Sequence, residues 1–180
     1  MLNSLYNTMP EPLSPAFEDS RTRVRWTIHA LHVRQHAMLA VLSSVRHRVS
    51  DSQLADLVIR HIHETHLHIR RLRCVGQLMS IDFVEADDSQ TLNELDCFAR
   101  QLANGMLNGD VDSVAVRSLT RLAVVEHGLY CYTRNVCQEL REFEIAALML
   151  ASEEEESHFI DQLTVYSGDF EIDCHLVMAD

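Results

Sequence analysis

The chain has 180 residues, which is enough for one compact domain of ordinary size and short for two. Hydrophobic residues make up 47% and charged residues 23%, a composition that excludes a disordered chain and a membrane-embedded one. Aspartate and glutamate outnumber arginine by 27 to 15, lysine is absent, and the net charge of −12 argues against general nucleic-acid binding.

Proline is confined to the start of the chain. All three prolines fall within the first 15 residues, and residues 1–18 show no hydrophobic period, so we predict a flexible N-terminal arm there. The rest of the chain has few helix breakers, since it holds five glycines and no proline. Long helices are therefore expected, and turn-rich β folds and glycine-loop nucleotide binders are disfavoured.

The cysteines and the lengths of the apolar stretches indicate where in the cell the protein is expected. The five cysteines form no CxxC pair and no zinc-finger spacing, and their odd number suggests reduced thiols and a cytoplasmic protein. The longest strongly apolar stretch, Ile145–Ala151, is far shorter than the roughly 20 residues that span a bilayer. We therefore expect no membrane partner.

The first two helices are predicted at residues 19–48 and 51–79. Apolar residues recur at three- and four-residue spacing along both, which is typical of an amphipathic helix. Gln35 interrupts the inner line of the first helix, and His61, Glu64 and His68 interrupt that of the second. The acidic stretch at 82–89 then ends the second helix.

Two further long helices are predicted in the second half. The third begins at 110–112 and runs to Leu140 with Glu126 on its inner line, and the fourth runs from about 143 to 166 with Glu155 inward. A short helix is expected between about 88 and 104, and the residues from 168 to 180 form an acidic tail. This order predicts an all-α four-helix bundle over residues 19–167, with an additional short helix in the long connection between helices 2 and 3.

The four polar interruptions are predicted to lie in one layer of this bundle. Gln35 and Glu64 lie about 15 and 14 residues from the first hairpin turn, and Glu126 and Glu155 each lie about 14 residues from the second. Because a helix rises about 1.5 Å per residue, these side chains should reach nearly the same level.

Carboxylates and imidazoles that converge inside a bundle are typical of a metal centre. The pair at 155 and 158 has Glu-x-x-His spacing, and the pair at 61 and 64 has the same spacing reversed. Such ligands suit iron, manganese or zinc. The candidate ligands are His61, Glu64, His68, Glu126, Glu155 and His158, with His32 as a substitute on the first helix. The alternative is a metal-free buried polar network formed by the same side chains.

Two motifs resemble the YciE/YciF family of ferritin-like bacterial stress proteins. The segment Arg60–Leu72 is similar to the family's His-x-x-Glu-Thr…Arg-Leu run on its second helix, and Val125-Glu126-His127 is similar to its Val-Glu-His on the third. The acidic run at 154–156 and Cys97 extend the resemblance, which covers roughly residues 25–166.

This resemblance implies a ferritin-like bundle, a homodimer and a di-metal carboxylate site with no firmly assigned reaction. His61, Glu64, Glu126 and Glu155 match the family's positions, while Gln35, Leu129 and Ile160 replace its carboxylates. Two functions follow. One is a stress-associated protein with a carboxylate/histidine metal site and iron- or manganese-dependent oxidoreductase or peroxide chemistry. The other is a degenerate, metal-free bundle that acts as a dimeric interaction or structural module, with room for another protein partner.

The charge is divided unevenly along the chain. Residues 1–80 hold 10 arginines against 6 acids, a balance of +4, and residues 81–180 hold 5 against 21, a balance of −16. This division favours arginine–carboxylate contacts between the two hairpins or between protomers.

Overall fold

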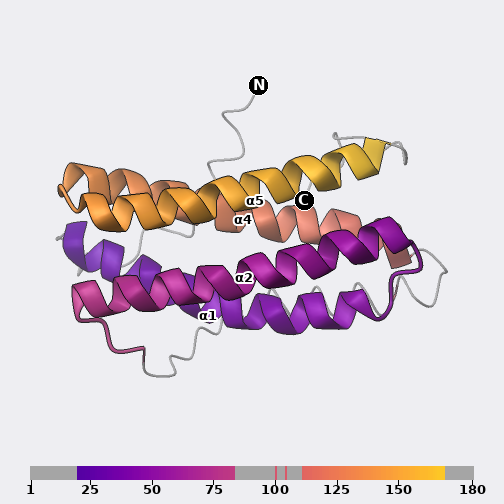
Figure 1. Ribbon diagram of the computed structural model, residues 1–180, viewed down its shortest axis with the longest axis horizontal. Helices are drawn as coiled ribbons and strands as arrows, with labels where there is room; N and C mark the ends of the chain where they lie inside the picture. The colour runs from indigo at the N-terminus through magenta and orange to yellow at the C-terminus, as the bar shows by residue number, and fades with distance from the viewer. Residues whose placement is uncertain (1–19, 84–99, 101–103, 105–110, 169–180) are drawn as a thin grey trace.

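The computed structural model describes residues 20–83, 100, 104 and 111–168. Four helices make up almost all of these residues: α1 (Ser20–Arg46), α2 (Ser52–Met79), α4 (Val111–Glu139) and α5 (Phe143–Gly168) (Figure 1). The described part of the chain contains no strand. The predicted all-α bundle and its four long helices are confirmed, with each bound within a few residues of the expected one.

The helices form two antiparallel hairpins that pack side by side, α1 with α2 and α4 with α5 (Figure 1). Across the hairpins, α1 contacts α4 and α2 contacts α5. The start of α1 lies beside the start of α5, where Arg21 Nη2 donates to Glu142 Oε1 at 2.7 Å. The start of α4 lies beside the α1–α2 turn, where Asp112 Oδ1 accepts from the Ser50 amide at 2.9 Å. The end of α2 lies at the opposite end of the bundle, where Arg25 Nη1 donates to the Met79 carbonyl at 2.6 Å.

Local capping explains where α2 begins and ends. Asp51 is its N-cap and accepts hydrogen bonds from the amides of Gln53 and Leu54 at 2.8 and 2.9 Å. At the other end Ser80 adopts the left-handed conformation with φ of 54°, which closes the last turn. Phe83 then folds back against Gly76, where an added Cβ would lie 2.2 Å from the Phe83 ring.

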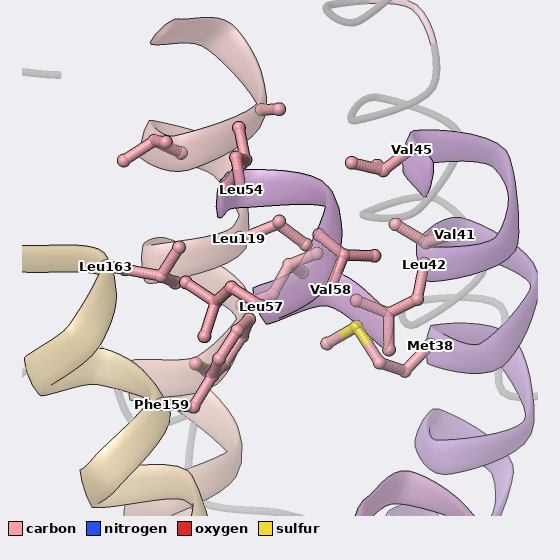
Figure 2. Close-up of a cluster of buried hydrophobic side chains, with 14 residues drawn as sticks. Met38, Val41, Leu42, Val45, Leu54, Leu57, Val58, Leu119, Phe159 and Leu163 are labelled. Atoms are coloured by element: carbon pink, nitrogen blue, oxygen red, sulfur yellow. The ribbon is translucent and has the colours of Figure 1, made fainter. Parts of the chain in front are cut away.

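Two apolar clusters fill the ends of the bundle. The first lies at the α1–α2 turn and joins all four helices through residues such as Met38, Leu54, Leu119 and Leu163 (Figure 2). The second lies at the other end, with Ile28, Leu72 and Met149 among its fully buried members. Nearly all buried polar side chains lie between or beside these two clusters. The candidate site is therefore bounded by apolar side chains at each end of the bundle.

Several sequence expectations lie outside the described residues. These are the arm at 1–18, most of the predicted short helix and most of the tail at 168–180. Of the short helix the structure describes Arg100 and Asn104, which are both helical and exposed. Among the described helices, none is both long and apolar enough to cross a membrane.

Candidate functional site

The polar interruptions do meet inside the bundle. Among the residues that the structure describes, ten polar or charged ones are buried, and they include one or more from each of the four long helices. The central group consists of fully or almost fully buried side chains: Gln35, His61, Thr65, His68, Glu126, Ser152 and Glu156. We call these residues, together with Arg34, Glu64, Arg71 and Glu155 at their edges, the polar layer.

On the α1–α4 side of the polar layer, an amide and a guanidinium contact one carboxylate. Gln35 Nε2 donates to Glu126 Oε2 at 2.5 Å. Arg34 Nε lies 3.9 Å from Glu126 Oε1, and both side chains are more than nine-tenths buried. Glu126 therefore has a buried hydrogen-bond donor on one oxygen and a buried cation near the other.

On the α2–α5 side, Glu155 is held from two directions. Arg71 donates to both of its oxygens, at 2.5 and 2.7 Å, and His68 Nε2 lies 2.9 Å from Oε2. Partial burial by itself would raise the pKa of Glu155, but the hydrogen bonds from Arg71 and His68 outweigh it and lower the pKa to about 2. Glu155 is therefore ionised and bidentately paired at neutral pH.

Glu156 lies deeper than Glu155 and is in a different state. Its side chain is fully buried, and neither oxygen meets a hydrogen-bond donor of good geometry among the described residues. Burial, followed by repulsion from Glu126 and Glu64, raises the pKa of Glu156 well above its usual range. The folded chain therefore favours the neutral, protonated form of Glu156.

His68 lies between two carboxylates of α5, those of Glu155 and Glu156. Its Nδ1 lies 3.3 Å from Glu156 Oε1 and 3.3 Å from Gln35 Oε1. Burial lowers the pKa of His68, and its hydrogen bond to Glu155 offsets only part of that shift, so the ring is neutral at neutral pH. A neutral ring carries one N–H, so it donates either from Nε2 to Glu155 or from Nδ1 to Gln35 Oε1, and not both.

His61 is placed by an aromatic neighbour. Its ring stacks on Phe159 with centroids 3.6 Å apart and planes within 7° of parallel. Nδ1 lies 3.1 Å from Glu64 Oε2, and Nε2 points to the interior, 3.7 Å from Glu156 Oε2. Nε2 has no hydrogen-bond partner among the described residues, so an imidazole nitrogen and a carboxyl group face each other without a bond.

Tyr130 closes the polar layer beside the second apolar cluster. Its ring centroid lies 5.4 Å from that of His68, and its side chain is fully buried. Burial, with added repulsion from Glu126 and Glu156, raises the pKa of Tyr130 well above 10. The phenol therefore stays protonated.

The structure brings together five of the seven candidate ligands: His61, Glu64, His68, Glu126 and Glu155. The other two lie elsewhere. His158 is exposed, and its Nε2 contacts Gln162 Nε2 at 2.9 Å. His32 stacks on Phe83 at 4.1 Å on the outer side of the α1–α2 hairpin, where burial followed by nearby positive charge lowers its pKa to about 4.

Three charged members of the polar layer, Glu156, Arg34 and Arg71, are not among the residues predicted from the sequence. The buried positions of α5 are 145, 146, 149, 152, 156, 159 and 163, so Glu156 is the inward residue and Glu155 lies at the edge. Residues 155 and 156 both lie three or four positions from Ser152 and from Phe159, so helical spacing alone did not separate them. The sequence pattern did not indicate that Arg34 and Arg71 belong to the polar layer, because arginine is common on helix surfaces beside an inner polar position.

The fit of a metal to the polar layer is incomplete. Among the described residues, no group of three or more His, Cys, Asp or Glu side chains is arranged to hold a metal ion. Both oxygens of Glu155 are occupied by Arg71, and Glu126 is paired with Gln35 and approached by Arg34. The inward atoms of Glu156 and His61 are the ones that a cation could still reach.

Comparison with known proteins supports the fold and leaves the chemistry open. No protein-family model matches the chain, and no curated protein matches it. A solved structure described as "YcfI, a putative structural protein from Rhodopseudomonas palustris" covers 85% of this chain and 98% of its own, with a TM-score of 0.76 and 13% sequence identity. At that identity the likeness establishes the fold alone, so the chain shares the bundle architecture of YcfI.

Proposed function

We propose that this chain is a structural module, a ferritin-like bundle whose polar layer is neutralised by arginine, an amide and protons in place of metal. The observation that carries the proposal is the bidentate pair between Arg71 and Glu155. Arg71 fills one lone-pair direction on each oxygen of Glu155 and His68 Nε2 lies at a second one on Oε2, so of about four directions only one is left, too few to bridge two cations.

The charges of the polar layer support the proposal. It holds four carboxylates, those of Glu64, Glu126, Glu155 and Glu156. Arg34 and Arg71 contribute two fixed positive charges, and burial keeps Glu156 protonated. The interior is thus close to neutral without a divalent cation, as a stable buried polar network requires. The description of YcfI as structural agrees with this role.

Elemental analysis combined with thermal unfolding tests the proposal. We expect the purified chain to hold far less than one iron, manganese or zinc ion per chain, and its Tm to stay unchanged when each metal is added in excess. The double variant Gln35→Glu/Arg71→Leu is the matched control, because it adds a carboxylate and frees Glu155. A metal-dependent rise in Tm for this variant alone would show that the arginine and the amide are what exclude metal.

A second candidate function is metal binding, with iron or manganese supplying a redox-active Lewis acid for oxidoreductase or peroxide chemistry. The unbonded Glu156 oxygens and His61 Nε2 favour it, since buried acceptors without donors are unusual. Glu156 and His61 would be the first ligands, and Glu126 would join them by exchanging its hydrogen bond from Gln35 for the metal. Stoichiometric metal in the native chain that is lost in Glu126→Ala and Glu156→Gln would replace the first proposal with this one. The stress-associated setting stays a prediction of the family resemblance.

A further inference from the structure

A second group of histidines lies outside the polar layer, on the outer side of the α1–α2 hairpin. His29, His32 and His36 follow one another along α1 at spacings of three and four residues. His32 and His36 are the only two histidines of the chain that lie four residues apart. Because residues at this spacing lie one above the other on a helix, the two imidazoles project from the same face of α1.

The rings of His32 and His36 are spaced as two ligands of one cation would be. Their centroids are 4.7 Å apart, and their planes are inclined at 69°. Two imidazoles at adjacent coordination positions have centroids about 4.5–5 Å apart, because each metal–nitrogen bond is about 2 Å long. The His36 side chain is exposed, so it can rotate between rotamers and turn a ring nitrogen toward His32.

His32 has a nitrogen that lacks a partner. Its ring is held in place by stacking on Phe83, with centroids 4.1 Å apart and planes 18° from parallel. Its Nε2 is buried and has no hydrogen-bond partner among the described residues. A buried polar atom without a partner is unusual and is often explained by a bound water or ion. A neutral imidazole can carry its proton on Nδ1 and leave the Nε2 lone pair for a metal.

The ligand set decides which cations fit. The pair is a two-ligand site, because no third His, Cys, Asp or Glu side chain in the described part of the chain is arranged to complete it. Among first-row divalent cations, nickel and copper bind imidazole nitrogen most strongly and favour square-planar or tetragonal sites with adjacent ligands at about 90°. Iron, manganese and zinc, the metals considered for the polar layer, stand lower in this order.

We propose that His32 and His36 form a surface site for a late divalent transition cation, nickel(II) or copper(II), on the outer side of the α1–α2 hairpin. The two rings bind as a chelate. Once one nitrogen holds the cation, the second ring is already beside it, which raises the affinity well above that of a single histidine. The site goes beyond the structural role proposed above and uses no residue of the polar layer, so either proposal can fail without the other.

Calorimetric titration with Ni²⁺ tests the site, since Ni²⁺ does not oxidise the free thiols of the chain as Cu²⁺ can. We expect one site per chain that is tighter than any other, and a rise in Tm as Ni²⁺ is added. His32→Gln and His36→Gln should each weaken binding at least tenfold. The double variant should weaken it little further, because either change alone breaks the chelate.

Two controls separate loss of the site from loss of the fold. His47→Gln, at an exposed histidine just beyond the end of α1, is the matched control and should bind Ni²⁺ as wild type does. His36 is also exposed, so His36→Gln should keep the circular dichroism spectrum and metal-free Tm of the wild-type chain.

A change on α2 tests the site without removing a ligand. Burial lowers the pKa of His32 and His36, and the charge of Arg73 lowers both further, so Arg73 faces the pair and opposes a bound cation. Arg73→Gln should therefore tighten Ni²⁺ binding several-fold, and the gain should shrink at high salt.

Three outcomes would overturn the proposal. One is a wild-type chain without a saturable Ni²⁺ site, and another is wild-type affinity in both His32→Gln and His36→Gln. The third is Ni²⁺ binding that is lost in Glu126→Ala and kept in His32→Gln, which would place the cation in the polar layer and support the second candidate function.

Discussion

The apolar clusters at the two ends of the bundle differ from the polar layer between them in what holds the helices together. In the cluster at the α1–α2 turn every buried side chain is apolar, and its stability comes from non-directional burial (Figure 2). In the polar layer, Gln35, His68 and Glu126 must keep particular partners and protonation states. A change in pH should therefore alter the stability that the polar layer contributes and leave the contribution of the apolar clusters unchanged.

The largest expected effect is in an apolar cluster. Leu119 is fully buried among side chains of all four helices, so Leu119→Ala should lower the free energy of unfolding by about 2–5 kcal/mol. The loss should be the same at pH 6 and pH 9, as measured by urea denaturation. Leu78→Ala, at a side chain that is 50% exposed, is the control and should cost little.

The next largest effect is expected at Glu126. Glu126→Ala removes the carboxylate that Arg34 approaches and the acceptor of Gln35, so we expect a loss of about 3 kcal/mol. A double-mutant cycle with Gln35→Ala should give a coupling energy of about 1 kcal/mol or more. Additive losses at these two sites would mean that the layer is not a network.

A smaller loss with a distinct pH dependence is expected at His68. Its pKa is lowered in the folded chain, so the unfolded chain takes up a proton first and stability falls as the pH drops below about 6.5. His68→Gln should cost about 1–2 kcal/mol at pH 7 through the lost bond to Glu155. It should also flatten the decline between pH 6.5 and 5, which urea titrations at several pH values would measure.

No loss of stability at neutral pH is expected for Glu156→Gln, which replaces a carboxylic acid by an amide of the same shape. Because the folded pKa of Glu156 is raised, wild type is fully stable only below the unfolded pKa of about 4 and loses stability as the pH rises from there through the folded pKa. Glutamine does not titrate, so the variant should match wild type near that lower pH and exceed it in free energy of unfolding at pH 7 and above. The variant should therefore be more resistant to alkaline unfolding than wild type. Equal alkaline midpoints would mean that Glu156 is ionised in the native bundle.

The polar layer shows how far residue spacing could predict the site. Distance from each hairpin turn placed Gln35, Glu64 and Glu126 at one level, because helical rise is constant and the turns are short. The same counting selected Glu155 in place of Glu156. On a helix, positions three and four residues from Ser152 both lie near its face, and only contact with α2 and α4 decides which one is buried.

The sequence by itself determined the four helices, their hairpins and the level of the polar interruptions, since these depend on local periodicity, capping and chain length. The tertiary structure alone decided which charges neutralise which. Arg71 reaches Glu155 and Arg34 approaches Glu126 only because α2 packs on α5 and α1 on α4. Burial in that packing then protonates Glu156. Ion pairing and desolvation of a side chain depend on how closely the neighbouring helices pack against it, so they cannot be inferred from the sequence of one helix.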